Sequence, residues 1–251
     1  IHKKLLYNNI KKRYNFLMGK KVSALIPAYN CEKTISDVVR MTKNYIRDIL
    51  VVSDGSRDNT SFEALKAGAE VLVLKENLGK GYAIQKGLGV LLKQDFDGIL
   101  FMDGDGQHNP EEIPKFLEVF EECDFVIGVR RLKKNNYPPL RRIPNYLGGL
   151  FLRKMTGWNL EDWQCGFRLS STDFLKKIPK IFKRYEMESQ MLIIASHLKV
   201  KTKIVEVETL YGSNSYFKAV KDTFFICLRS LDLYYERKKT EDSLDPLLLL
   251  Q

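Results

Sequence analysis

The sequence predicts an α/β protein with a doubly wound, mostly parallel sheet and helices on both faces. Short runs of β-branched and other apolar residues recur through the first half of the chain, and helix-like stretches separate them. Strands that are apolar throughout are typical of a parallel sheet that is buried on both faces. The residues that follow these runs are polar and acidic, as expected where ligands bind beyond the carboxyl ends of the strands.

The apolar runs place the expected strands at 22–26, 49–52, 70–74, 98–102, 125–129 and 203–208. The amphipathic stretches place helices at 32–46, 58–68, 80–93, 111–121 and 143–157, with a loop at 133–140. Thr60 and Asn109 are expected to begin helices, because both can cap a helix and Pro110 suits a first turn. At 216–235, apolar residues at helical spacing predict an amphipathic C-terminal helix.

Composition restricts the class of protein further. With 44% apolar and 29% charged residues, the chain of 251 residues is not of a disordered, collagen-like or disulfide-scaffold type. Its four cysteines lie far apart without a C-x-x-C pair, which favours neither a zinc site nor a disulfide framework. We expect one domain over 21–212, preceded by a basic segment at 1–20 and followed by an amphipathic, membrane-interfacial region at 213–251. No signal peptide or membrane-spanning stretch is expected.

The positive charge is concentrated in two segments. The net charge is +10, yet 1–21 and 125–160 hold seven and eight Lys or Arg residues respectively and no acid. The rest of the chain is therefore acidic on balance. Such segments suit a nucleic acid, an anionic membrane surface or a phosphorylated substrate.

The segment after the fourth expected strand carries a candidate metal site. Asp103, Asp105 and Gln107 alternate along a turn, and oxygen ligands of this kind suit Mg²⁺ or Mn²⁺. An EF-hand is excluded by the spacing, since His108 occupies the position that requires glycine. We expect His108 to be a turn residue rather than a ligand. The 79–81 segment, Gly-Lys-Gly, is by itself a weak signal for a phosphate-binding turn.

Four ordered motifs carry a resemblance to a known family. They are Pro27-Ala28-Tyr29-Asn30-x-Glu32, Val51-Val52-x-Asp54-Gly55-Ser56-x-Asp58-x-Thr60, Asn77-x-Gly79-Lys80-Gly81 and Asp103-x-Asp105-x-Gln107-His108-x-Pro110. In order and spacing they resemble the inverting family 2 glycosyltransferases of the GT-A fold. The resemblance continues through 162–168 to about residue 230. Within the family the sequence is most similar to polyprenyl-phosphate (dolichyl-phosphate) mannosyl- and glucosyltransferases, which move a sugar from a nucleotide diphosphate onto a lipid phosphate.

The resemblance implies residues for the donor side. Those that would hold the nucleotide sugar are Pro27, Ala28, Tyr29, Glu32, Asp54, Lys80, Asp103 and Gly104. Asp103, Asp105 and Gln107 would bind the Mg²⁺ or Mn²⁺ that bridges the donor diphosphate. Ser53 and Cys31 depart from the acidic residues that are usual in the family, which leaves the choice between a GDP-hexose and a UDP-hexose open.

The acceptor side depends on whether the acceptor is a phosphate or a hydroxyl. A phosphate is already anionic and needs positive charge rather than a general base, so Arg130, Arg142 and Asn145 are assigned to it. Gln164 is expected to line the sugar or acceptor side. If the acceptor is a sugar hydroxyl, Glu188 is the candidate base. The expected catalytic set is Asp105, Arg130, Gln164 and Glu188.

These assignments predict transfer of mannose or glucose to a polyprenyl phosphate, with the enzyme peripheral on the cytoplasmic face of a membrane. The 216–235 helix and the apolar 146–158 stretch could lie in the interface, or pack in the core or in a homodimer. A glycosyltransferase that acts on a glycan or glycolipid hydroxyl stays an alternative. A basic binding module for nucleic acid and a non-catalytic sugar-nucleotide sensor are disfavoured by the paired carboxylates at the strand ends.

Overall fold

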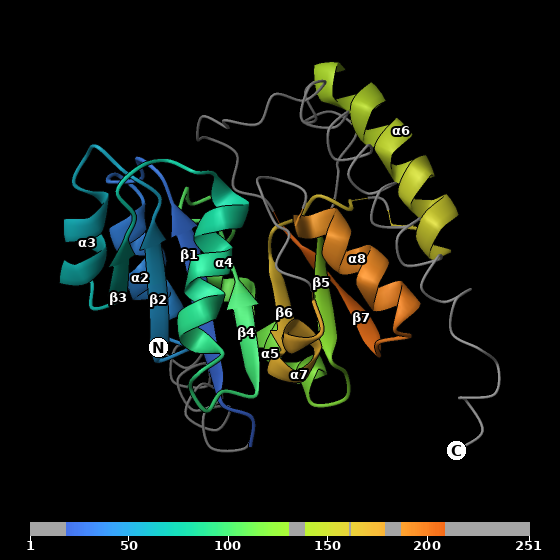
Figure 1. Ribbon diagram of the computed structural model, residues 1–251, viewed down its shortest axis with the longest axis horizontal. Helices are drawn as coiled ribbons and strands as arrows, with labels where there is room; N and C mark the ends of the chain where they lie inside the picture. Colours follow the sequence, from blue (N-terminus) through green and yellow to red (C-terminus); the bar gives the residue numbers. More distant parts are fainter. Residues whose placement is uncertain (1–18, 131–138, 161, 179–186, 209–251) are drawn as a thin grey trace, which may run out of the picture.

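The structure, a computed structural model, describes residues 19–130, 139–160, 162–178 and 187–208, of which 139–147 by backbone alone (Figure 1). Within these residues the strands form one sheet in the order β3-β2-β1-β4-β6-β5-β7. The strands are β1 (Val22–Ala28), β2 (Asp48–Ser53), β3 (Glu70–Val73), β4 (Gly98–Phe101), β5 (Phe125–Arg130), β6 (Arg168–Ser171) and β7 (Thr202–Val207). The helices are α2 (Ile35–Thr42), α3 (Thr60–Lys66), α4 (Lys80–Leu91), the 3₁₀ turn η1 (Pro110–Glu112), α5 (Ile113–Phe120), α6 (Pro139–Thr156), α7 (Thr172–Lys176) and α8 (Met187–His197).

The sheet is mostly parallel, as the sequence predicts. β1 pairs in parallel with β2 and β4, β2 with β3, and β5 with β7. The exception is β6, which lies antiparallel between β4 and β5 and was not expected, because its residues include no apolar run. Since Arg168 pairs with Phe101, β6 begins at the edge where β4 ends. The loop that precedes β6 therefore arrives at the ligand-binding edge of the sheet.

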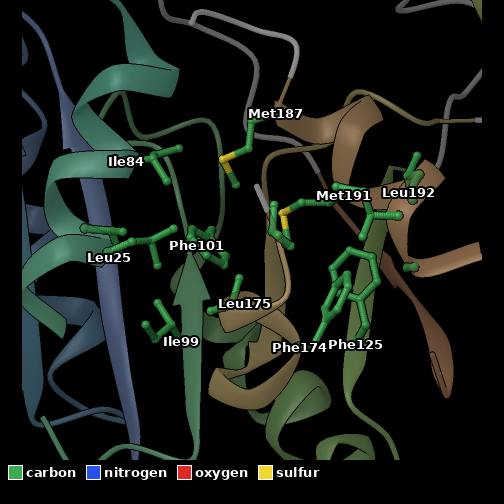
Figure 2. Packing of buried hydrophobic residues seen from close by; sticks show 14 of the residues in the cluster. Leu25, Ile84, Ile99, Phe101, Phe125, Phe174, Leu175, Met187, Met191 and Leu192 are labelled. Atoms are coloured by element: carbon green, nitrogen blue, oxygen red, sulfur yellow. The ribbon is translucent and has the colours of Figure 1, made fainter. Parts of the chain in front are cut away.

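Helices cover both faces of the sheet, which confirms the predicted fold class. Successive side chains of a strand point to opposite faces, and β1 shows this directly. Leu25 belongs to the apolar core beneath α4, α7 and α8, whereas Ala24 and Ile26 belong to the core beneath α2, α3 and α5. Figure 2 shows the first core, where Ile84 of α4 and Met191 of α8 lie over strand residues such as Phe101.

The expected helix starts differ in outcome. The Asn109 side chain accepts a hydrogen bond from Glu111 N and caps η1, as predicted. α3 begins at Thr60, as predicted, but the N-cap is Asn59, so Thr60 is the first helical residue and not the cap. Its hydroxyl instead donates to Asp58 Oδ1. α6 begins at Pro139, so the end of the expected 133–140 loop is helical, in keeping with the fixed φ of proline in a first turn.

The apolar 146–158 stretch packs mainly within the chain. From Gly148 onward, where side chains are described, Leu152 is buried and Phe151, Met155 and Trp158 pack against the core. Leu150 is 45% exposed. No helix in the described part of the chain is long and apolar enough to cross a bilayer. Nearly all of the basic 1–20 segment and the whole 216–235 helix lie outside the described residues, so their assignment and the domain boundary at 212 stay predictions.

Candidate active site

The loops that follow β1 and β4 contact each other at the carboxyl edge of the sheet. Gly104 N donates to Pro27 O over 3.2 Å, and Thr34 Oγ1 donates to Gly104 O over 2.8 Å. A Cβ at position 104 would lie 3.0 Å from Ala28 Cβ, so a larger residue would push the loops apart. Pro27, Ala28 and Gly104, which were assigned to the nucleotide sugar, are thus neighbours.

We call 29–34 and 54–60 the donor-side loops. Backbone N–H groups and side-chain oxygens tie them together, and Tyr29 lies half-buried at the start of the first loop. The hydrogen bonds run from Asn30 N to Ser56 Oγ (3.1 Å), Arg57 N to Asn30 Oδ1 (2.9 Å), Glu32 N to Asp58 Oδ2 (3.1 Å), Asn59 N to Glu32 Oε2 (3.1 Å) and Cys31 N to Thr60 Oγ1 (2.7 Å). The carboxylate of Glu32 therefore already binds backbone on the opposite loop.

Asp54 fixes the turn that begins α4. It is 3% exposed, and its Oδ1 and Oδ2 accept hydrogen bonds from Leu78 N (3.0 Å) and Gly79 N (2.8 Å). Gly79 has φ +98°, a conformation that side chains rarely adopt. The turn places Lys80 at the first position of α4. A nucleotide contact by Asp54 stays a prediction.

Lys80 joins two carboxylates from distant parts of the chain. Its Nζ lies 2.7 Å from Asp103 Oδ1 and 2.8 Å from Glu188 Oε1, on α8. Burial raises the pKa of Asp103, but Lys80 and His108 outweigh that effect and hold this pKa well below its usual range. Burial alone would lower the pKa of Lys80, but the charges of Asp103 and Glu188 raise it by more. The pKa of Lys80 is therefore above its usual value, and the ammonium stays charged. The sequence assigned these three residues to the site without indicating that they meet.

The remaining candidate metal ligands lie beside this cluster. Asp105 Oδ1 accepts a hydrogen bond from Gln107 N (3.0 Å). The pKa of Asp105 is raised, mainly because the carboxyl is buried and secondly because it lies near the negative charge of Asp103. His108 is buried, with Nε2 3.4 Å from Asp103 Oδ2 and its ring 5.2 Å from that of Phe167. In the described residues no three His, Cys, Asp or Glu side chains gather to hold a metal. The side-chain oxygens of Asp105 and Gln107 are of the kind that Mg²⁺ and Mn²⁺ prefer.

We call 162–167 the anchored loop, because a buried ion pair holds its start. Asp162 is fully buried and accepts hydrogen bonds from Arg130 N (3.1 Å), Nε (2.5 Å) and Nη2 (2.8 Å). One edge of the Arg130 guanidinium is thus bound to Asp162. The sequence assigned Arg130 to the acceptor phosphate and gave Asp162 no role. The Arg130 side chain is 21% exposed.

Gly166, in the middle of the anchored loop, lies close against Lys80 and Asp103. A Cβ at Gly166 would lie 2.7 Å from Lys80 Nζ and 3.0 Å from Asp103 Oδ2, so only glycine allows this approach. Gln164 Nε2 and Glu188 Oε2 are buried and have no hydrogen-bond partner in the described chain. Buried polar groups are usually bonded. Both atoms belong to residues that the sequence assigned to the catalytic set, and each is free to bind a polar ligand.

Two predicted acceptor residues cannot be placed in the same detail. Arg142 and Asn145 lie on α6, in the part described by backbone alone. Conversely, Asp162 and Arg168, at the two ends of the 162–168 stretch, were given no role from the sequence. A charged residue next to an apolar one carries no signal that it will be buried in an ion pair or a hydrogen-bond network, so only their partners in the fold reveal them.

The sheet order and the acidic strand ends are those of the GT-A fold. The structure is similar to the crystal structure of mannosyl-3-phosphoglycerate synthase from Rubrobacter xylanophilus, with TM-score 0.72 and 22% identity over 96% of this chain and 81% of that one. It is also similar to glucosyl-3-phosphoglycerate synthase from Mycobacterium tuberculosis in complex with Mn²⁺, UDP-glucose and phosphoglyceric acid. That match has TM-score 0.68 and 18% identity over 90% and 82% of the two chains.

The chain belongs to glycosyl transferase family 2, whose sequence model matches residues 23–178. One relative is the UDP-N-acetylglucosamine–dolichyl-phosphate N-acetylglucosaminyltransferase of Methanococcus voltae, 32% identical over 79% of this chain and 89% of that protein. Another is the undecaprenyl-phosphate mannosyltransferase of Micrococcus luteus, 35% identical over 63% of this chain and 69% of that protein. The resemblance found in the sequence is thereby confirmed, and the protein is a glycosyltransferase.

Proposed function

We propose that this glycosyltransferase moves a hexose, mannose or glucose, from a GDP- or UDP-sugar to a polyprenyl phosphate, with inversion at the anomeric carbon. The relatives from M. voltae and M. luteus are named for dolichyl-phosphate and undecaprenyl-phosphate acceptors, and this supports the acceptor class. The sugar and the base are not distinguished by these names, because the two relatives are named for different sugars.

The observation that carries the proposal is two buried polar atoms without a partner in the described chain, one on Glu188, which binds Lys80, and one on Gln164, two residues before Gly166. Gln164 Nε2 is a donor and Glu188 Oε2 an acceptor, and both lack a partner in the described chain. A sugar hydroxyl both donates and accepts, so a hexose could satisfy them together. Lys80, held between Asp103 and Glu188, adds a positive charge for the donor diphosphate.

The side-chain oxygens of Asp103, Asp105 and Gln107 suit a divalent cation. Asp105 and Gln107, with Asp103 beside them, would hold Mg²⁺ or Mn²⁺, which would offset the negative charge of the leaving diphosphate. Asp105 has a raised pKa because it is buried near Asp103, and a cation would relieve the repulsion between the two carboxylates.

In the proposed step, an oxygen of the acceptor phosphate forms a bond to the anomeric carbon of the donor sugar. The bond from that carbon to the β-phosphate oxygen breaks, and its electron pair leaves with the nucleoside diphosphate. The acceptor brings no proton that must be removed, so no general base is needed. Arg130 would hold the acceptor phosphate, oriented by its hydrogen bonds to Asp162.

A lipid acceptor requires the enzyme to reach a membrane surface. We propose peripheral attachment at the cytoplasmic face, with the basic segments 1–21 and 125–160 attracted to anionic headgroups. Exposed Leu150 and the 216–235 segment are the candidate apolar contacts. Whether a homodimer forms stays open.

The test is a transfer assay with purified protein, a panel of labelled GDP- and UDP-sugars, and Mg²⁺ or Mn²⁺. Polyprenyl phosphate, the matching polyprenol and soluble sugar acceptors are offered in parallel. We expect label to enter the organic phase with the lipid phosphate alone, and EDTA or Asp105→Ala to abolish it. Transfer only to hydroxyl acceptors would overturn the phosphate acceptor, and an Asp105→Ala variant with the wild-type rate would overturn the metal.

A further inference from the structure

Arg168 is a cation buried completely within the fold. Its guanidinium donates from Nε to Cys165 O (2.9 Å), from Nη1 to Glu188 O (2.5 Å) and from Nη2 to Trp163 O (2.8 Å). Burying a charge is costly unless it is hydrogen-bonded, so these contacts must hold firmly. Three backbone carbonyls from two segments therefore converge on one planar group.

The identity of these carbonyls connects Arg168 to the site. Trp163 and Cys165 flank Gln164 in the anchored loop, and the third carbonyl belongs to Glu188 itself. Glu188 binds Lys80, and Gln164 lies two residues before Gly166, which approaches Lys80 and Asp103 closely. Each of the two residues has a buried polar atom that lacks a partner in the described chain. Arg168 thus fixes the backbone at both residues without reaching the site with its own side chain.

We propose that Arg168 is a positioning residue that sets Gln164 and Glu188 at the spacing needed to bind the donor sugar. The inference rests on the proposed function, since it assumes that these two side chains meet the hexose. Displacement of a substrate-binding group by about 1 Å can lower a rate about 100-fold. Arg168 therefore influences catalysis through the backbone that it holds.

Arg168→Lys is the decisive variant, because lysine keeps the charge but lacks the rigid fork that spans three carbonyls. Arg168→Gln keeps a planar hydrogen-bond donor but removes the charge. It serves as the second variant if the Arg168→Lys protein does not fold. Thr172→Ala is the matched control. It removes the buried hydrogen bond from Thr172 Oγ1 to Phe96 O (2.9 Å) at the far end of β6, where it can destabilise the fold without touching the site.

Titration calorimetry of each variant compares the nucleoside diphosphate with the nucleotide sugar, using the GDP- or UDP-sugar that the wild-type protein binds most tightly. We expect Arg168→Lys to bind the diphosphate within about twofold of wild type, but to lose the extra affinity that the sugar confers. Its kcat should fall about 100-fold at temperatures where it is folded. Thr172→Ala should keep both properties.

Arg168→Lys with wild-type sugar discrimination and kcat would overturn the proposal. Equal weakening of both ligands, or failure of both Arg168 variants to fold, would also overturn it, because Arg168 would then serve stability alone. The binding comparison needs no acceptor. Wild-type protein that binds nucleotide sugar but transfers it to no lipid phosphate would therefore refute the proposed acceptor while still testing Arg168.

Discussion

The two sides of the site are held together by different forces. On the donor side, the loops at 29–34 and 54–60 are joined by hydrogen bonds between backbone N–H groups and side-chain oxygens, several of them exposed. On the other side, the anchored loop and α8 are held by buried charges. Lys80 lies between Asp103 and Glu188, and Arg130 binds fully buried Asp162.

The difference predicts where substitutions will matter. A hydrogen bond near solvent contributes about 1 kcal/mol, because water replaces a lost partner. Removing one member of a buried charged pair costs about 3–5 kcal/mol, because the partner is left unpaired. We therefore expect the hydrogen bonds between the donor-side loops to tolerate single substitutions, and the buried charged contacts of Lys80 and Arg130 to fail on them.

Lys80→Met should have the largest effect. It leaves Asp103 and Glu188 without their shared cation, and we expect a loss of about 3 kcal/mol in the free energy of unfolding, measured by urea denaturation. Lys86→Met is the control, since Lys86 is exposed on the same helix. Adding Glu188→Gln to Lys80→Met should recover part of the loss. Equal stability of the two lysine variants would refute the comparison.

Gly166→Ala should act mainly on activity. The added Cβ would meet Lys80 Nζ and Asp103 Oδ2 at or below 3.0 Å, so the cluster or the loop must shift. We expect transfer to fall about 100-fold in steady-state assays. Gly89→Ala, on α4 with nothing within 4 Å of the new Cβ, should keep full activity and gain up to about 1 kcal/mol of stability. Unchanged transfer in Gly166→Ala would contradict the close approach.

Ser56→Ala should have the smallest effect. It removes the acceptor for Asn30 N, which is exposed and can bond water instead, and the acceptor for the hydroxyl of buried Ser53, 3.0 Å away. We expect a loss of about 1–2 kcal/mol in unfolding free energy and a transfer rate within about threefold of wild type. A loss as large as that in Lys80→Met would show that the donor side is as rigid as the charged side.

The fold could be predicted because its signals are local. Apolar runs such as 98–102 and the capped turn at Asn109 report their structure through neighbours in sequence. The strand β6 was not predicted, because its residues include no apolar run and its place is set by pairing with β4 and β5. The helix start at Thr60 was predicted, but the role of its side chain was not, since its hydroxyl accepts a hydrogen bond from Cys31 N in the loop after β1 rather than capping the helix.

The sequence by itself determined the mostly parallel α/β class and the family, and it proposed the site residues, because motif spacing and periodicity are properties of the chain. Only the tertiary structure decided that Lys80 pairs with Glu188, 108 residues away, that Asp162 binds Arg130, and that Arg168 holds both sides of Gln164. Such contacts depend on antiparallel β6 and on the burial of charge. Both arise when distant segments pack together, and neither leaves a local pattern in the sequence.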